Sequence, residues 1–175
     1  MPEQFSTSKK RSMTSVYMAA AIASAWGHEV RIIEHNLDKL VVPYPGLVGV
    51  HDPGDLEITK LDRDGSSKSH IVDAKQALAW KERKFSFQKI FVTTKEQYHN
   101  DRAYWVFSAD LSRVAFVKPK SVPEDRLIFE ETVNRRSGPQ ISVGVPIKFA
   151  VFKDVIALLV KGHKANFNEE VTNGS

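Results

Sequence analysis

The chain has 175 residues, of which 42% are hydrophobic and 26% are charged, values that exclude a mainly disordered protein and suit one domain with its own core. Its net charge of +4, with an isoelectric point near 9.2, is compatible with nucleic acid binding but is not diagnostic of it. Cysteine is absent, which excludes disulfides, thiolate zinc sites and cysteine nucleophiles. This absence fits a reducing cytoplasm, so we expect an intracellular protein.

The first half of the chain predicts a helix followed by strands. Residues 1–7 are expected to be a flexible tail, and residues 8–26 a helix that Gly27 ends. The alanine-rich part of this helix is too short to span a bilayer, so no membrane contact is expected; a weak signal peptide is the alternative for it. Three segments alternate like strands, and Asp64-Gly65 predicts a hairpin between the last two: they are residues 28–36, 55–62 and 69–78.

The second half of the chain is mostly extended. Residues 84–92 are expected to be extended, and residues 93–101 a short helix capped by Thr93 or Thr94. The remaining elements are two strands around a tight turn, a further extended segment, a helix and a flexible tail: residues 103–110, 113–119, 140–152, 153–163 and 164–175. This order predicts a single α/β domain, in which helices flank a mixed central sheet.

An acid and a lysine end the predicted strand Ile71-Val72-Asp73-Ala74-Lys75. Side chains alternate along a strand, so Asp73 and Lys75 share one face. The hairpin brings Asp55 or Glu57 within reach of Asp73, depending on the register, and a turn centred near residue 65 makes Glu57 the direct partner. Two neighbouring carboxylates repel each other unless a cation or a proton lies between them. A surface salt bridge on an edge strand is the plain alternative.

These residue types suit phosphodiester hydrolysis. Magnesium binds oxygen ligands, among them one or two carboxylates together with waters and phosphate oxygens. A bound divalent cation polarises the phosphate and lowers the pKa of its water. A nearby lysine ammonium can stabilise the negative charge that grows on the phosphate.

Gly54-Asp55, followed after a hairpin by the strand end Val72-Asp73-Ala74-Lys75, resembles the active-site pattern of the PD-(D/E)XK nuclease superfamily. The downstream sequence FSFQKIFVTTKEQYHNDRAYWVF is also similar to that group, so the resemblance covers residues 9–120. It implies a restriction-endonuclease-like or Holliday junction resolvase-like fold and hydrolysis of DNA with Mg²⁺ or Mn²⁺. By the same resemblance Asp55, Asp73 and Lys75 would be catalytic. Asp55, Asp73 and the backbone carbonyl of Ala74 would bind the metal.

Two features depart from the family pattern. Many members carry an acid on the first helix that helps to bind a second metal, whereas residues 8–26 contain none. A second metal would therefore need Glu34 or Glu57 as a ligand. Pro53 also lies two residues before Asp55 instead of adjacent to it.

Candidate DNA-binding residues follow the acid–lysine strand. Lys81, Arg83, Lys84 and Lys89 are interleaved with aromatic residues and could grip a phosphate backbone, although a solvated loop explains them equally well. Gln97 is a candidate for orienting a water or a phosphate, with a surface glutamine as the alternative.

The sequence thus predicts a metal-dependent DNA endonuclease, either structure-selective like a resolvase or of a compact restriction or homing type. Cleavage of two strands needs two active sites, so a homodimer is expected, with the apolar stretches 140–152 and 155–160 as candidate interfaces. The alternative is a non-catalytic DNA-binding or assembly module of the same fold.

Overall fold

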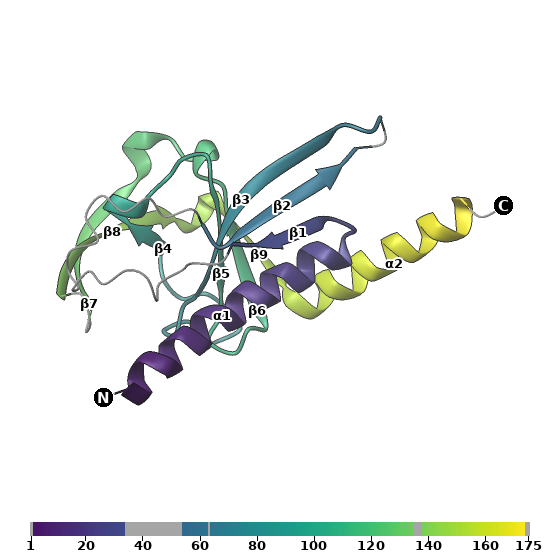
Figure 1. Cartoon of the computed structure of the whole chain (residues 1–175). Helices are drawn as coiled ribbons and strands as arrows, with labels where there is room; N and C mark the ends of the chain where they lie inside the picture. The colour runs from purple at the N-terminus through teal and green to yellow at the C-terminus, as the bar shows by residue number, and fades with distance from the viewer. Residues whose placement is uncertain (1, 34–53, 63, 135–137, 174–175) are drawn as a thin grey trace.

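The computed structural model describes residues 2–33, 54–62, 64–134 and 138–173. In this part of the chain, a six-stranded sheet, a three-stranded sheet and two long helices surround two apolar cores (Figure 1). The larger sheet consists, in spatial order, of β1 (Glu29–Ile32), β2 (Leu56–Leu61), β3 (Ser67–Gln76), β5 (Ala103–Phe107), β6 (Arg113–Val117) and β9 (Ala150–Asp154). Because β3 and β5 are parallel and the other pairs are antiparallel, the sheet is mixed. This confirms the predicted mixed central sheet of an α/β fold.

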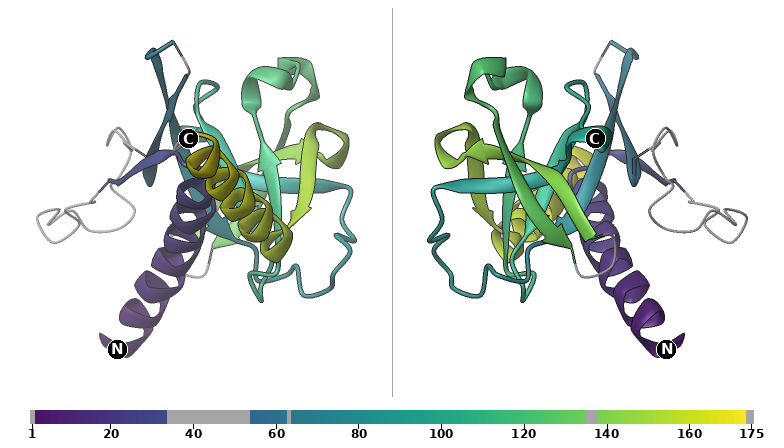
Figure 2. Two further views of the ribbon diagram at one scale, coloured as in Figure 1. Left: turned by 90° about the vertical axis from the view of Figure 1, so that its right-hand side faces the viewer. Right: turned by 90° about the vertical axis from the view of Figure 1, so that its left-hand side faces the viewer.

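One face of the larger sheet is covered by α1 (Pro2–Ala25), against which α2 (Val155–Asn173) packs. The small side chains of Ala19 and Ala23 lie in this core together with Val72 and Ala74 of β3. Gly27 ends the helix as predicted, since its φ is +76° and the following N–H of His28 donates to the carbonyl of Ala23 at 3.1 Å. Figure 2 shows α2 beside the C-terminal part of α1. Neither helix in the described ranges is long and apolar enough to cross a membrane.

The other face of the larger sheet packs against a second sheet, formed in the order β4 (Lys89–Thr94), β8 (Gly138–Pro146) and β7 (Ile128–Asn134). Tyr104 and Val106 of β5 lie in this second core with Val143 and Val145 of β8. Asp73 and Lys75 alternate with the residues that face α1, so both are on the side of the second sheet. The strand pattern therefore places the acid and the lysine between two layers of structure.

Three predicted boundaries need correction. Residues 2–7 and 164–173, expected to be flexible tails, are helical, because α1 begins at Pro2 and α2 continues to Asn173. The helix expected over residues 93–101 is a single 3₁₀ turn at Lys95–Gln97. Thr93 and Thr94 instead pair with β8, which keeps their backbone extended, and neither hydroxyl caps the turn.

The β2–β3 hairpin projects beyond the short strand β1 (Figure 1). Asp64-Gly65 lies in its turn as predicted, with a φ of +81° at Gly65. The register pairs Leu56 with Val72 and Glu57 with Ile71, so the expectation that Glu57 is the partner of Asp73 is wrong. The turn is centred one residue earlier than assumed, since Asp62 N–H donates to the carbonyl of Ser66. A shift of one residue in the turn moves each cross-strand partner by two.

Candidate active site

Asp55 lies beside the end of β3 that carries Asp73. Its backbone N–H donates to the carbonyl of Val72 at 3.1 Å, although the register pairs Val72 with the next residue, Leu56. Its side-chain Oδ2 accepts a hydrogen bond of 2.8 Å from the backbone N–H of Ala74. Because β2 begins only at Leu56, the partner of Val72, the carboxylate provides the acceptor that a longer strand would have provided. The structure thus brings Asp55 to Asp73-Ala74-Lys75.

Gly54 allows this close approach. It is buried, and its φ is +85°, a backbone conformation that favours glycine. A Cβ at this position would lie 2.3 Å from Cγ2 of Ile71 and 3.3 Å from Oδ1 of Asp73. The Gly54-Asp55 pair in the sequence therefore has a steric reason: the residue before Asp55 must have no side chain.

Asp73 is almost completely buried, and it pairs with Arg102. The Nη1 atom of Arg102 donates to Oδ2 of Asp73 at 3.1 Å and to Oδ1 at 3.3 Å. The side chains are only 3% exposed for Asp73 and 5% exposed for Arg102. A buried carboxylate costs several kcal/mol unless a partner compensates it, and Arg102 is such a partner.

Arg102 did not emerge from the sequence as a site residue. It directly precedes β5, the strand that runs parallel to β3, and the register places Ala103 beside Val72. A cation at the start of an apolar strand is a weak signal. This signal points to a partner of Asp73 only when β3 is known to lie beside β5.

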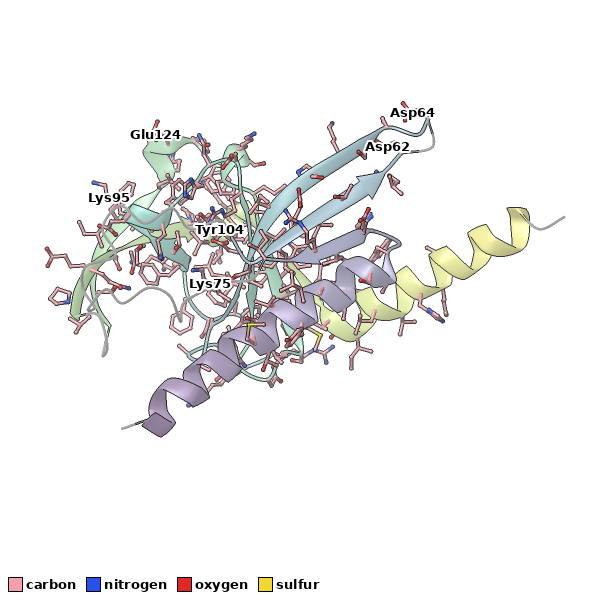
Figure 3. The ribbon with its side chains drawn as sticks, viewed as in Figure 1. Asp62, Asp64, Lys75, Lys95, Tyr104 and Glu124 are labelled. Atoms are coloured by element: carbon pink, nitrogen blue, oxygen red, sulfur yellow. The ribbon has the colours of Figure 1, made fainter. Side chains whose placement is uncertain are left out.

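Lys75 points between the two sheets and contacts β4. Its Nζ lies 3.4 Å from Oγ1 of Thr93, to which it donates. The hydroxyls of Thr93 and Thr94 are 3.5 Å and 3.4 Å from Oε1 of Gln97. Gln97, a candidate from the sequence, is therefore linked to Lys75 through Thr93. Figure 3 shows Lys75 and Tyr104 near the centre of the molecule.

Tyr104 is the register partner of Asp73 on β5 and supports the same region. Its phenol oxygen accepts a hydrogen bond of 3.0 Å from the backbone N–H of His99. Burial raises the pKa of Tyr104 far above its ordinary value, and the negative charge of Asp73 acts in the same direction. Tyr104 is thus a neutral hydrogen-bonding group and cannot serve as a base near neutral pH.

The structure describes one of the two candidate ligands for a second metal, Glu57. Glu57 forms an ion pair with Arg31 of β1, at 2.6 Å between Oε2 and Nη2. Glu34 lies outside the described residues. The register places Glu57 opposite Ile71, and the carboxylate of Glu57 is engaged by Arg31 on the neighbouring strand β1.

The proposed DNA-binding residues are dispersed. Lys81, Arg83 and Lys84 are exposed on the loop between β3 and β4, and Arg83 lies 4.0 Å from Asp154 of β9, at the far edge of the sheet from β1. Trp80 holds this loop against β9, with its ring centroid 5.7 Å from that of Phe152. Lys89 is paired with Glu130 in the second sheet. These lysines and the arginine therefore form no single patch around Asp73.

The oxygen atoms proposed as metal ligands all accept hydrogen bonds from protein donors. The donor set consists of the carboxylates of Asp55 and Asp73 and the carbonyl of Ala74, which also accepts a hydrogen bond of 3.0 Å from Ser15 Oγ. Among the described residues, no group of three or more histidines and acids is placed to hold a metal ion. Carboxylate and carbonyl oxygens are donor types that Mg²⁺ and Mn²⁺ prefer, and the guanidinium of Arg102 already lies at the carboxylate of Asp73.

Comparisons of the chain with protein-family models, with curated proteins and with solved structures gave no match. Function is therefore inferred from the geometry of these side chains.

Proposed function

We propose that the chain is a Mg²⁺- or Mn²⁺-dependent DNA endonuclease that hydrolyses phosphodiester bonds at Asp55, Asp73 and Lys75. One observation supports this proposal: the carboxylate of Asp55 accepts a hydrogen bond from the backbone N–H of Ala74, the residue between Asp73 and Lys75, which share one face of β3. These two carboxylates and this lysine are the residues by which the sequence resembles the PD-(D/E)XK pattern. A restriction-endonuclease-like fold is part of the same proposal.

Each residue has a defined role in this reaction. Asp55, Asp73 and the carbonyl of Ala74 would hold the cation, which when bound supplies an activated water and neutralises phosphate charge. Lys75 would stabilise the negative charge that develops on the phosphate, with its ammonium positioned by the hydroxyl of Thr93. Gln97 in turn orients Thr93 and Thr94.

The proposed substrate is DNA, cut by two copies of the chain. The net charge of +4 and the exposed Lys81, Arg83 and Lys84 favour contact with phosphates. Cutting two strands needs two sites, and the exposed Ile156 and Val160, one turn apart on α2, offer an apolar surface to a second copy. The small size of the chain favours a structure-selective enzyme or a compact restriction or homing type.

A second candidate function is a non-catalytic DNA-binding or assembly module. The Asp73–Arg102 pair favours it, because Arg102 neutralises the buried carboxylate without a metal. The bond from Ala74 N–H gives Asp55 a structural role as well. This candidate predicts binding to DNA or to a partner protein that is equal with and without EDTA, and no cleavage.

The two functions are separated by a cleavage assay on supercoiled plasmid and a four-way junction with Mg²⁺, Mn²⁺ or EDTA. Wild type is compared with Lys75→Ala and Asp73→Asn, and with Lys68→Ala as a matched control, since Lys68 is an exposed lysine on the same strand. The nuclease predicts metal-dependent cutting by wild type and Lys68→Ala, and none by Lys75→Ala at an unchanged melting temperature. Absence of cutting by wild type with either metal, together with EDTA-insensitive DNA binding, would favour the module.

A further inference from the structure

Arg102 occupies the position at Asp73 that a metal would need. Its Nη1 atom lies 3.1 Å and 3.3 Å from the two carboxylate oxygens of Asp73. We propose that Arg102 is a built-in cation that competes with the divalent metal for Asp73. It would keep the metal-free site folded and lower the affinity of that site for metal. This inference rests on the proposed metal site of the nuclease.

The burial of both groups makes the competition strong. Neither charge is exposed to water, so Asp73 needs a counter-ion at all times and Arg102 provides it in the absence of metal. Mg²⁺ binds oxygen ligands at about 2.0–2.1 Å, which places a double positive charge close to any group that shares those oxygens. Metal binding to Asp73 must therefore displace the guanidinium or tolerate repulsion from it.

The residues around the Asp73–Arg102 pair restrict how the guanidinium can move away from a bound metal. A Cβ at Gly54 would lie 3.3 Å from Oδ1 of Asp73 and 3.7 Å from Cζ of Arg102, so the backbone of Gly54 closes one side of the pair. Tyr104, two residues after Arg102, is tied to the backbone of His99. Displacing Arg102 from Asp73 moves a buried guanidinium, and this carries a free-energy cost that metal binding must exceed.

The test measures Mn²⁺ affinity by isothermal titration calorimetry, and melting temperature with Mn²⁺ and with EDTA. Arg102→Met should melt well below wild type in EDTA, because Asp73 loses its counter-ion. The same variant should bind Mn²⁺ on the order of tenfold more tightly than wild type and gain more stability from it. Equal or weaker Mn²⁺ binding by Arg102→Met would overturn the proposal.

Two further variants keep the test decisive if Arg102→Met folds poorly. The double variant Asp73→Asn with Arg102→Met removes both charges, and should recover stability in EDTA and lose its response to Mn²⁺. A response of the double variant equal to that of wild type would overturn the proposal. Arg102→Lys keeps the charge but lacks the fork of the guanidinium, so its Mn²⁺ affinity should lie between those of wild type and Arg102→Met.

The outcomes also separate this inference from the nuclease itself. Tighter Mn²⁺ binding by Arg102→Met without any DNA cleavage would support the competition and refute the nuclease. Metal-dependent cleavage with the same Mn²⁺ affinity in wild type, Arg102→Lys and Arg102→Met would support the nuclease and refute the competition.

Discussion

Oδ2 of Asp55 accepts a 2.8 Å hydrogen bond from the backbone N–H of Ala74, the residue between Asp73 and Lys75. The bond ties the start of β2 to the end of β3, and Ala74 itself is buried against α1. Asp55, a proposed metal ligand, is therefore also the hydrogen-bond acceptor for the buried backbone N–H of Ala74. Substitutions at this position must separate the loss of the hydrogen bond from the loss of the charge.

Asp55→Ala is expected to lower the free energy of unfolding by about 1–3 kcal/mol, because the buried N–H of Ala74 loses its acceptor. Asp55→Asn keeps an oxygen acceptor and should retain most of the stability, while losing metal-dependent cleavage. Urea denaturation of the two variants beside wild type measures the difference. An equal loss of stability in both would show that the charge, and not the hydrogen bond, is what matters to the fold.

Gly54→Ala should be far more destabilising than Gly65→Ala. Both glycines have a positive φ, +85° and +81°, so both variants carry backbone strain of about 1–3 kcal/mol. At Gly54 the added Cβ would also lie 2.3 Å from Cγ2 of Ile71, whereas at Gly65 nothing lies within 4 Å. Overpacking adds about 1–3 kcal/mol at Gly54 alone. Thermal unfolding of both variants is the measurement, and equal melting temperatures would contradict the close packing at Gly54.

Gly162→Ala should weaken the packing of α2 on α1. A Cβ at Gly162 would lie 2.8 Å from the backbone carbonyl carbon and oxygen of Ala25, and backbone atoms cannot rotate away. The higher helix propensity of alanine acts in the opposite direction but is worth only about 1 kcal/mol. We therefore expect a net loss in urea denaturation, of about 1–3 kcal/mol. Lys161→Ala, an exposed change one residue earlier, should be close to neutral; a stabilised Gly162→Ala would refute the contact.

Thr93→Val is expected to slow cleavage roughly tenfold, because it removes the hydroxyl that positions the Lys75 ammonium. Thr94→Val is the matched control, since Thr94 contacts Gln97 but is not hydrogen-bonded to Lys75 in the described contacts. Initial cleavage rates with saturating Mg²⁺ compare the two. Equal rates for Thr93→Val and wild type would show that Lys75 needs no support from β4.

Asp110 should make stability fall at acidic pH. Its Oδ1 accepts hydrogen bonds from Ser108 Oγ at 2.7 Å, Ser112 N–H at 3.1 Å and Ser112 Oγ at 2.8 Å, which lower the pKa of Asp110 to about 2. The pKa is lower in the folded than in the unfolded state. Its contribution is therefore full above the unfolded value of 3.8 and is lost as the pH falls towards 2.

An NMR titration of the Asp110 carboxyl carbon should give a midpoint close to 2. Unfolding of Asp110→Asn should depend less on pH than that of wild type between pH 4 and pH 2. A midpoint near 3.8 would contradict the three hydrogen bonds of this turn.

The sequence by itself determined the features that depend on neighbouring residues. Asp64-Gly65 predicts the hairpin turn, and Gly27 predicts the end of α1, since each requires only a local backbone conformation. The alternation of side chains along one strand suffices to place Asp73 and Lys75 on the same face.

Only the tertiary structure decided which residues meet across strands. The choice of Asp55 over Glu57 depends on a one-residue difference in the centre of the turn, which no composition rule resolves. The pairing of Asp73 with Arg102 depends on β5 lying parallel beside β3, although the two residues are 29 positions apart in the chain. Such contacts follow from the order of strands in the sheet. That order is set by the burial of all strands together, so the sequence around Asp73 could indicate that the carboxylate needs a cation but not that Arg102 provides one.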